Sequence, residues 1–170
     1  MDKIVFITGA SSGIGAGCAR KFASQGASLI LNARNVNKLS ALKEELEKQY
    51  GAKIYLLPFD VRDRKAATSA LESLPKEWQS IDILVNNAGL VIGTDKEQEG
   101  SLDEWDIVID TNIKALLAMT RLIVPGMVER KRGHIINIGS IAGDAAYPGG
   151  SVYCATKAAV KALSDRKSVV

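Results

Sequence analysis

The stretch "ITGASSGIGAG" (residues 7–17) stands between a short apolar run and a longer helical pattern, and it decides how the chain folds. The apolar run, "KIVFIT" (residues 3–8), is typical of a buried strand. After the glycines, Ile14, Cys18 and Phe22 recur every four residues, a spacing that predicts a helix. The chain therefore opens with a strand, a glycine-rich turn and a helix.

Three glycines of this turn, Gly9, Gly13 and Gly15, stand where the backbone must turn sharply. The first N–H groups of a helix and its dipole attract anions, and glycine lets a phosphate come close to the backbone. A glycine-rich turn by itself can also be simple loop punctuation. Its position between a strand and a helix, at the start of an alternating pattern, favours a site for the pyrophosphate of a dinucleotide.

The rest of the chain repeats the alternation of strand and helix. Helical patterns separate four further apolar runs, at residues 27–33, 52–59, 81–88 and 133–140. Such nearly continuous apolar runs are typical of parallel strands that are buried on both faces. We predict one doubly wound α/β domain over residues 1–170, a Rossmann-like parallel sheet with helices on both faces.

A long helix is predicted in the second half of the chain. Ser101 stands three residues before Glu104, the spacing of a capping box at a helix start. We expect the helix to run to about Glu129, with a break near Pro125 and Gly126.

Composition excludes several classes of protein. The chain has 46% hydrophobic residues and a net charge of +3, values typical of a globular protein. The densest basic run, residues 130–132, has no interleaved aromatic residues, so we do not expect nucleic-acid binding. The two cysteines, Cys18 and Cys154, form no metal-ligand pair, and we predict no metal site. No stretch approaches the roughly 20 apolar residues of a membrane span, and we expect a cytoplasmic location.

The spacing of the glycines is T-G-x-x-x-G-x-G, and with it the sequence resembles the short-chain dehydrogenase/reductase family. The resemblance covers Ile4 to about Asp165. It rests on motifs in family order: "TGASSGIG" (8–15), "NNAG" (86–89), Asn112, Ser140, and Tyr153 with Lys157. It implies a sheet with strand order 3-2-1-4-5.

The segment after the second strand, "LNARN" (residues 31–35), indicates which nicotinamide cofactor is used. A 2′-hydroxyl needs a carboxylate acceptor, whereas a 2′-phosphate needs a guanidinium. The chain has Ala33 and Arg34 here, an arrangement similar to that of NADP-preferring members of the family. We therefore predict NADP, although Arg34 could also be a solvated residue at a helix start.

The family's other cofactor contacts map onto this sequence by its motifs. The resemblance implies that Asp60 holds the adenine amino group and that Val61 packs on the ring; Asp60 could instead be a solvated helix cap. The predicted cofactor-binding residues are Gly9, Ser11, Ser12, Gly13, Ile14, Gly15, Arg34, Asp60, Val61, Asn87, Ala88, Gly89, Tyr153 and Lys157.

Tyr153 and Lys157 are the candidates for acid–base chemistry. A phenol with a pKa near 10 is a poor acid or base at neutral pH, and a cation one helical turn away would lower that pKa. The resemblance implies that Tyr153 transfers the proton and that Lys157 tunes it and holds the nicotinamide ribose. It also implies that Ser140 binds the substrate oxygen and that Asn112 positions a water. The implied reaction is hydride transfer between a secondary alcohol and NADP.

Within the family, the sequence is most similar to NADP-dependent 3-hydroxy acid dehydrogenases, which oxidise serine and related small hydroxy acids. The residues that carry this similarity are "GTD" (93–95) and "YPGG" (147–150). The 3-oxoacyl-carrier-protein reductases share the catalytic motifs and are the enzymatic alternative.

Family members continue beyond the helix that bears the tyrosine, with two further strands and a substrate lid. This sequence leaves the family pattern after Asp165 and ends at Val170. We therefore expect it to be part of a longer enzyme; the alternative is a short, inactive cofactor-binding or interaction remnant. The resemblance also implies a homodimer or homotetramer, formed through the helices that begin near Ser101 and Val152.

Overall fold

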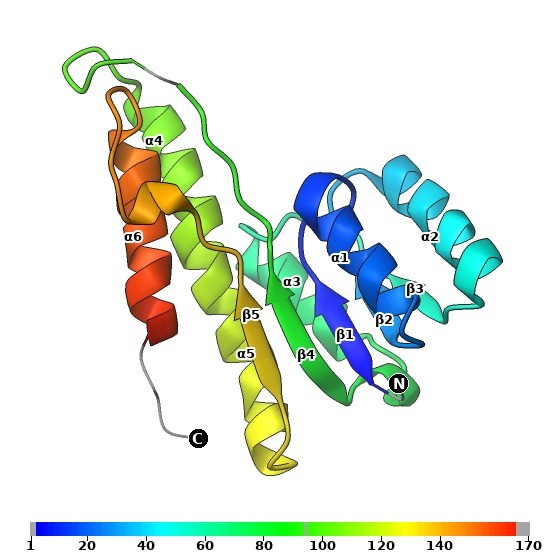
Figure 1. The fold of residues 1–170 in the computed structure, drawn as a ribbon. Coiled ribbons are helices and arrows are strands. Elements are labelled where there is room, and N and C mark those ends of the chain that lie inside the picture. Colours follow the sequence, from blue (N-terminus) through cyan, green and yellow to red (C-terminus); the bar gives the residue numbers. More distant parts are fainter. Residues whose placement is uncertain (1–2, 94, 166–170) are drawn as a thin grey trace.

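The computed structural model describes residues 3–93 and 95–165, which form a five-stranded parallel sheet between helices (Figure 1). The strands are β1 (Ile4–Ile7), β2 (Ser28–Leu31), β3 (Ile54–Leu56), β4 (Ile81–Asn86) and β5 (His134–Asn137). The helices are α1 (Gly13–Ala23), α2 (Val36–Tyr50), α3 (Arg64–Glu72), α4 (Leu102–Ile109), α5 (Leu116–Glu129) and α6 (Ser151–Asp165). Three short segments complete them: the 3₁₀ turns η1 (Lys76–Trp78) and η3 (Ile141–Gly143), and the π-helix η2 (Asp110–Ala115).

The strand order is β3-β2-β1-β4-β5, with every neighbouring pair parallel. This confirms the predicted fold class and the order implied by the family resemblance. The order reverses at β1, so the segments that leave β1 and β4 diverge at the carboxyl edge of the sheet. Ligands of doubly wound folds bind in the crevice at this point.

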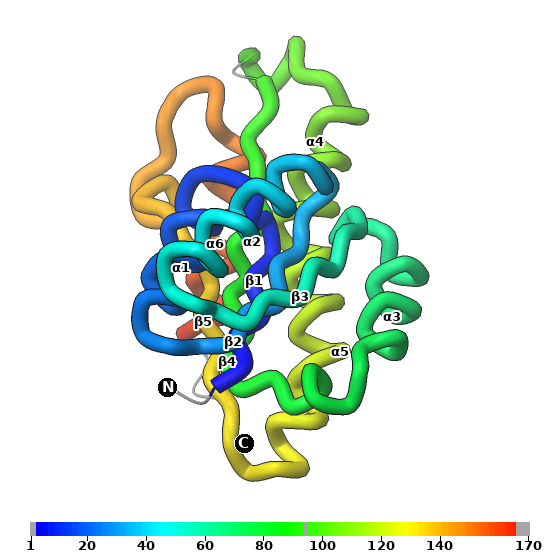
Figure 2. Tube along the Cα trace, turned by 90° about the vertical axis from the view of Figure 1, so that its right-hand side faces the viewer, coloured from blue at the N-terminus to red at the C-terminus, as the bar shows by residue number. Residues whose placement is uncertain are grey.

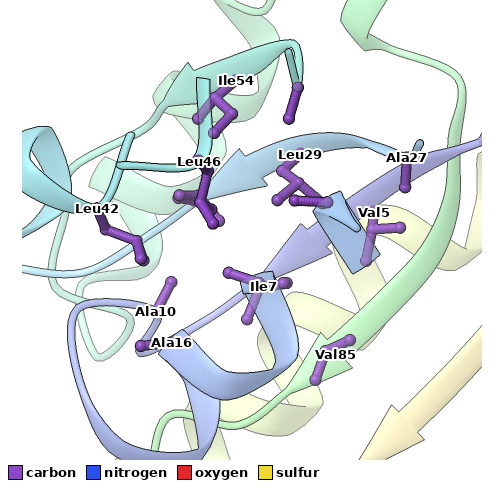
Figure 3. Close-up of a cluster of buried hydrophobic side chains, with 14 of the residues drawn as sticks. Val5, Ile7, Ala10, Ala16, Ala27, Leu29, Leu42, Leu46, Ile54 and Val85 are labelled. Carbon is purple, nitrogen blue, oxygen red and sulfur yellow. The ribbon is translucent and has the colours of Figure 1, made fainter. Parts of the chain in front are cut away.

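Alternate residues of the central strands pack into two separate cores. On β1, Val5 and Ile7 face α1 and α2, whereas Phe6 faces the layer of α3 and α5. Figure 2 shows these two helical layers on opposite sides of the sheet. Figure 3 shows part of the first core, where Ile7, Leu29, Leu46 and other labelled side chains gather. Burial on both faces explains the nearly continuous apolar runs in the sequence.

Helix α1 packs on the sheet through its smallest residues. Gly15, Ala16, Ala19 and Ala23 are buried, whereas Ile14 is 62% exposed. A Cβ atom at Gly15 would lie only 2.3 Å from the carbonyl oxygen of Gly9. The helix therefore needs glycine at this position in order to approach the β1–α1 turn so closely.

The long helical region differs from the prediction in one respect. Ser101 caps α4 as predicted, with its side chain accepting a hydrogen bond from the backbone N–H of Glu104. The expected break near Pro125 and Gly126 is wrong, because α5 continues through Pro125 to Glu129. Ile123 and Met127, on either side of the proline, are both buried in the same core, and this packing maintains the helix. The irregularity lies earlier, at η2.

The expectation that helices cover both faces of every strand is wrong for β5. Its first two residues, His134 and Ile135, are exposed, and the next two are only partly buried. Among the described residues β5 has one strand neighbour, β4, and so receives less cover than the inner strands. None of the helices within residues 3–93 and 95–165 has the length and apolar content needed to cross a membrane.

Candidate functional site

A cavity of about 870 Å³ opens at the carboxyl edge of the sheet. Its walls come from the β1–α1 turn, the segments that follow β2, β3, β4 and β5, and the start of α6. Most of the predicted cofactor-binding residues line it: Gly9, Ser11, Ser12, Gly13, Ile14, Arg34, Asp60, Val61, Asn87, Ala88, Gly89, Tyr153 and Lys157. Gly15 is not among the lining residues, because it is buried beneath the turn against Gly9.

The floor of the cavity is the β1–α1 turn. Gly9 and Gly13 have φ values of 63° and 52°, a left-handed conformation that favours glycine. A Cβ atom at Gly9 would lie 2.9 Å from Ala88 Cα, whereas one at Gly13 would meet no atom within 4 Å. Ser12 makes no side-chain capping bond, so the first N–H groups of α1 are available to an anion.

Thr8 and Asn87 fasten this turn to the end of β4. The Thr8 hydroxyl accepts hydrogen bonds from the backbone N–H groups of Asn87 and Ala88, both at 3.0 Å. The Asn87 amide donates to the carbonyls of Thr8 at 2.9 Å and Gly9 at 3.1 Å. Sequence reasoning missed the role of Thr8, although Thr8 opens the quoted glycine motif. The two residues give this end of the cavity a fixed shape.

A buried amide holds together the segments that follow β2 and β3. Asn32 is fully buried, and its Nδ2 donates to the carbonyls of Leu57 at 3.0 Å and Phe59 at 3.1 Å. This pairing continues the sheet beyond its last ladder bonds. As a result, Arg34 and Asp60, which are distant in sequence, lie on the same wall of the cavity.

Asp60 is bound mainly by Arg62, a residue to which the sequence assigned no role. The Asp60 carboxylate accepts hydrogen bonds from Arg62 Nε at 3.0 Å and Arg62 Nη2 at 2.6 Å, and from the Arg62 backbone N–H at 3.0 Å. Arg34 Nη1 is 3.9 Å away and its side chain is 68% exposed. These cations, Arg62 first, lower the pKa of Asp60. The alternative in which Asp60 caps a helix is wrong, because Asp63 caps α3.

Tyr153 and Lys157 lie one turn apart on α6 at the other end of the cavity. Lys157 is buried, and its Nζ donates to the carbonyl of Ile138 at 2.9 Å. The same Nζ is 5.8 Å from the centre of the Tyr153 ring. Burial lowers the pKa of Lys157, because it disfavours the charged ammonium. The two side chains therefore lie close together on the wall of the cavity.

Asn112 lies in the π-helix η2 and joins three segments of the chain. Its amide donates to the Leu90 carbonyl at 2.9 Å and to Thr156 Oγ1 at 3.0 Å, and its Oδ1 accepts from the Leu90 N–H at 2.9 Å. A Cβ atom at Gly89 would lie 3.2 Å from Asn112 Oδ1 and 3.6 Å from Lys157 Nζ. Single π-helical turns are frequent at functional sites, and this one lies directly behind the cavity wall.

The structure does not bring Ser140 into the lining of the cavity, although the preceding residue, Gly139, does line it. The Ser140 hydroxyl accepts a hydrogen bond from the backbone N–H of Ala142 at 3.1 Å and caps η3. A second, narrow hollow of about 20 Å³ adjoins the cavity and shares Val91 and Tyr153 with it. Of the "GTD" triplet, Thr94 lies outside the described residues.

Comparison with protein families matches residues 3–168 to the short chain dehydrogenase family. The NADP-dependent 3-hydroxy acid dehydrogenase of Escherichia coli K12 is 50% identical over 161 residues, which are 95% of this chain. The crystal structure of serine dehydrogenase from Escherichia coli is also similar, with 50% identity and a TM-score of 0.89. The aligned region is 95% of this chain and 73% of the serine dehydrogenase chain.

A closed form of serine dehydrogenase complexed with NADP+ is also similar, with 48% identity and a TM-score of 0.88. The aligned region is 95% of this chain and 63% of the serine dehydrogenase chain in that structure. The chain likewise spans 63% of the length of the curated Escherichia coli relative.

Proposed function

The chain belongs to the short-chain dehydrogenase family, and from that premise we propose that it is part of an NADP-dependent oxidoreductase acting on a small 3-hydroxy acid. The observation that carries the proposal is the shared cavity. One end of this cavity has a glycine-rich turn at a helix N-terminus, and the other has Tyr153 beside Lys157. A dinucleotide that spans the cavity would bring its nicotinamide to the phenol.

The residues present fit NADP. Gly13 leaves open space above the turn, and the first N–H groups of α1 suit a pyrophosphate. The volume of about 870 Å³ falls within the range of cofactor pockets. Ala33 offers no carboxylate to a ribose 2′-hydroxyl, and the exposed guanidinium of Arg34 suits a 2′-phosphate. When bound, NADP would supply the hydride acceptor for oxidation of an alcohol.

The chain's own residues would move the proton of that reaction. We assign to Tyr153 the proton transfer with the substrate hydroxyl, and to Lys157 the stabilisation of the phenolate and a contact with the nicotinamide ribose. Removal of the proton by a positioned base contributes about 10²- to 10⁴-fold to such a rate.

Two further residues complete the proposed site. We assign to Asn112 the positioning of a water; its side chain is itself held by hydrogen bonds to Leu90 and Thr156. Ser140 would donate a hydrogen bond to the substrate oxygen. For this the Ser140 hydroxyl must turn from η3, where it now accepts from Ala142.

The substrate class rests on the relatives, whose names include 3-hydroxy acid dehydrogenase and serine dehydrogenase. A panel of L-serine, 3-hydroxybutyrate and a 3-oxoacyl thioester would test it. Oxidation of the two hydroxy acids with NADP is the expected result. Reduction of the thioester alone would contradict the proposed substrate and support the reductase alternative.

The first experiment is a titration of the purified 170-residue chain with NADPH, with NADH as the control, followed by nicotinamide fluorescence. Binding with a clear NADPH preference is expected, and Arg34→Ala should abolish that preference. Absence of binding to either cofactor would contradict the proposal and favour an inactive remnant.

Self-association and a cytoplasmic location are also part of the proposal. Leu117 and Val128, eleven residues apart and therefore on one face of α5, are exposed apolar side chains that a second copy could cover. Sedimentation equilibrium should give a dimer or tetramer, and a monomer at micromolar concentration would contradict this. The cysteines Cys18 and Cys154 are free, as expected in a reducing compartment.

A further inference from the structure

The cavity wall that we propose to contact the adenosine contains one carboxylate, that of Asp60, with a guanidinium on each side of it. Arg62 grips Asp60 through two side-chain nitrogens and its backbone N–H, with the shortest contact at 2.6 Å. Arg34 is the second cation, 3.9 Å from the same Oδ2 atom. All three residues line the main cavity. The carboxylate is therefore shared unequally, and Arg62 has the larger part.

The unequal sharing matters because Arg34 has two possible partners. A 2′-phosphate needs this guanidinium, and so does Asp60 whenever its charge is not satisfied elsewhere. The side chain of Arg34 is 68% exposed and those of Arg62 and Asp60 are about one third exposed, so the Arg62–Asp60 pair is the better ordered. Bidentate arginine–carboxylate pairs are stronger than single, solvated contacts.

We propose that Arg62 sets the strength of the NADP preference: it occupies the Asp60 carboxylate, so that Arg34 remains free to bind the 2′-phosphate. The inference rests on the proposed function, because it concerns the same cofactor. Without Arg62, Asp60 has only Arg34 as a cationic partner within 4 Å among the described residues. The carboxylate would then compete with the 2′-phosphate for Arg34, and its negative charge would also repel the phosphate.

A purely structural role for Arg62 predicts a different result. If Arg62 only supported the turn between β3 and α3, its loss would weaken nucleotides with and without a 2′-phosphate by the same factor. Removing the charge of Asp60 would then not restore the preference. The two roles are therefore separated by a ratio of affinities and by a double mutant.

The test uses two probes that differ only in the 2′-phosphate, adenosine 2′,5′-bisphosphate and adenosine 5′-monophosphate. Their dissociation constants are measured by calorimetry on the 170-residue chain, in which Arg34, Asp60 and Arg62 all line the cavity. The variants are Arg62→Ala, Asp60→Asn and the double mutant. Lys65→Ala is the matched control, since it removes an exposed cation outside the cavity lining.

In Arg62→Ala the preference for the bisphosphate should fall by roughly tenfold, the size expected for diverting one charged contact. In the double mutant it should return to within about threefold of the wild type, and Lys65→Ala should leave it unchanged. A preference that survives in Arg62→Ala, or that stays low in the double mutant, would overturn the inference. If Arg62→Ala does not fold by circular dichroism, Arg62→Gln provides the same comparison.

The outcome for the wild type separates this inference from the proposed function. If the wild type binds neither nucleotide, the assignment of NADP fails and the role of Arg62 fails with it. The same holds if the wild type does not prefer the bisphosphate, or if its preference persists in Arg34→Ala. If the wild type prefers the bisphosphate through Arg34 and Arg62→Ala keeps that preference, only the role of Arg62 is wrong.

Discussion

Strands β2 and β5 are both four residues long and parallel to their neighbours, but they differ in how far they are buried. Three of the four residues of β2 are completely buried, between β1 and β3. In β5, His134 and Ile135 are exposed. Burial here follows the position of a strand in the sheet, since β2 lies between two strands and β5 has one strand neighbour among the described residues. This contrast divides the candidate site into two unequal halves.

The half of the candidate site that we propose to bind the nucleotide is formed by segments that follow the well-buried strands. Its turn follows β1, and Thr8, Asn32 and Asn87 fasten its walls to neighbouring strands. The half that contains the proposed catalytic residues lies beside the sparsely covered strand β5. Ser140 follows β5, and Lys157 donates to the carbonyl of Ile138 in the segment after it. We therefore expect nucleotide binding to be more robust than turnover.

The largest expected effect separates binding from turnover. Tyr153→Phe should lower kcat with a 3-hydroxy acid and NADP by about 10²-fold or more, because it removes the hydroxyl to which we assign the proton transfer. Affinity for NADPH should change by less than about threefold, since the phosphate and adenosine walls are untouched. The measurements are steady-state rates and fluorescence titration on a preparation that turns over. Retention of most of the turnover would refute the assignment of Tyr153.

The next effect concerns stability and compares the two strands directly. Leu29→Ala on β2 should lower the free energy of unfolding by about 2–5 kcal/mol, because it leaves a cavity in a sealed core. Ile135→Ala on β5 should cost less than about 1 kcal/mol, because the side chain is 37% exposed. Urea unfolding measures both. Equal losses would mean that β5 is as well covered as β2 in solution.

A smaller effect tests the packing of α1. Gly15→Ala should lower the free energy of unfolding by about 1–3 kcal/mol, because its Cβ would meet the Gly9 carbonyl oxygen and Asn87 Nδ2. Gly17→Ala, two residues further on the same helix, has no atom within 4 Å of the new Cβ. It should raise stability by about 0.5–1 kcal/mol, because alanine is the better helix former. Thermal unfolding of the two variants should move in opposite directions.

The smallest effect is a pH dependence in the catalytic half. Burial lowers the pKa of Lys157 from its ordinary value of 10.5. Between the lowered pKa and 10.5 the unfolded chain binds more protons than the folded chain, so stability rises with pH in this window. The wild type should therefore gain stability relative to Lys157→Met as the pH is raised toward 10.5. A relative loss would mean that the ammonium has a stabilising partner that outweighs its burial.

The sequence predicted the fold well because its strongest patterns are those of the well-buried half. Apolar runs on β1, β2 and β4 reflect burial on two faces, and the glycine spacing reflects the close approach of Gly15 to Gly9. Ser101 was likewise predictable, because a cap depends on a few neighbouring residues.

Features that depend on distant contacts were not predictable. The contact of Arg34 with Asp60 requires knowledge of how two loops meet. The pairing of Asp60 with Arg62, two residues away, depends on how one irregular loop folds, for which the sequence has no clear pattern. The break expected at Pro125 was wrong because packing on both sides of it outweighs a local preference. The orientation of Ser140 depends on η3, a single turn with a weak local pattern. Pattern reasoning thus gives elements and motifs, whereas the partners of side chains come from the tertiary structure.

The buried amide of Asn32 has a consequence for protein engineering. Its two hydrogen bonds, to the carbonyls of Leu57 and Phe59, fix the spacing of two backbone segments. Asn32 is fully buried, whereas the side chain of Arg34, which we propose to bind the 2′-phosphate, is 68% exposed. The residue that fixes the backbone is therefore distinct from the residues proposed to contact the cofactor. A library that aims to switch the cofactor can vary positions 33, 34 and 62, provided that Asn32 is kept so that the two backbone segments remain joined.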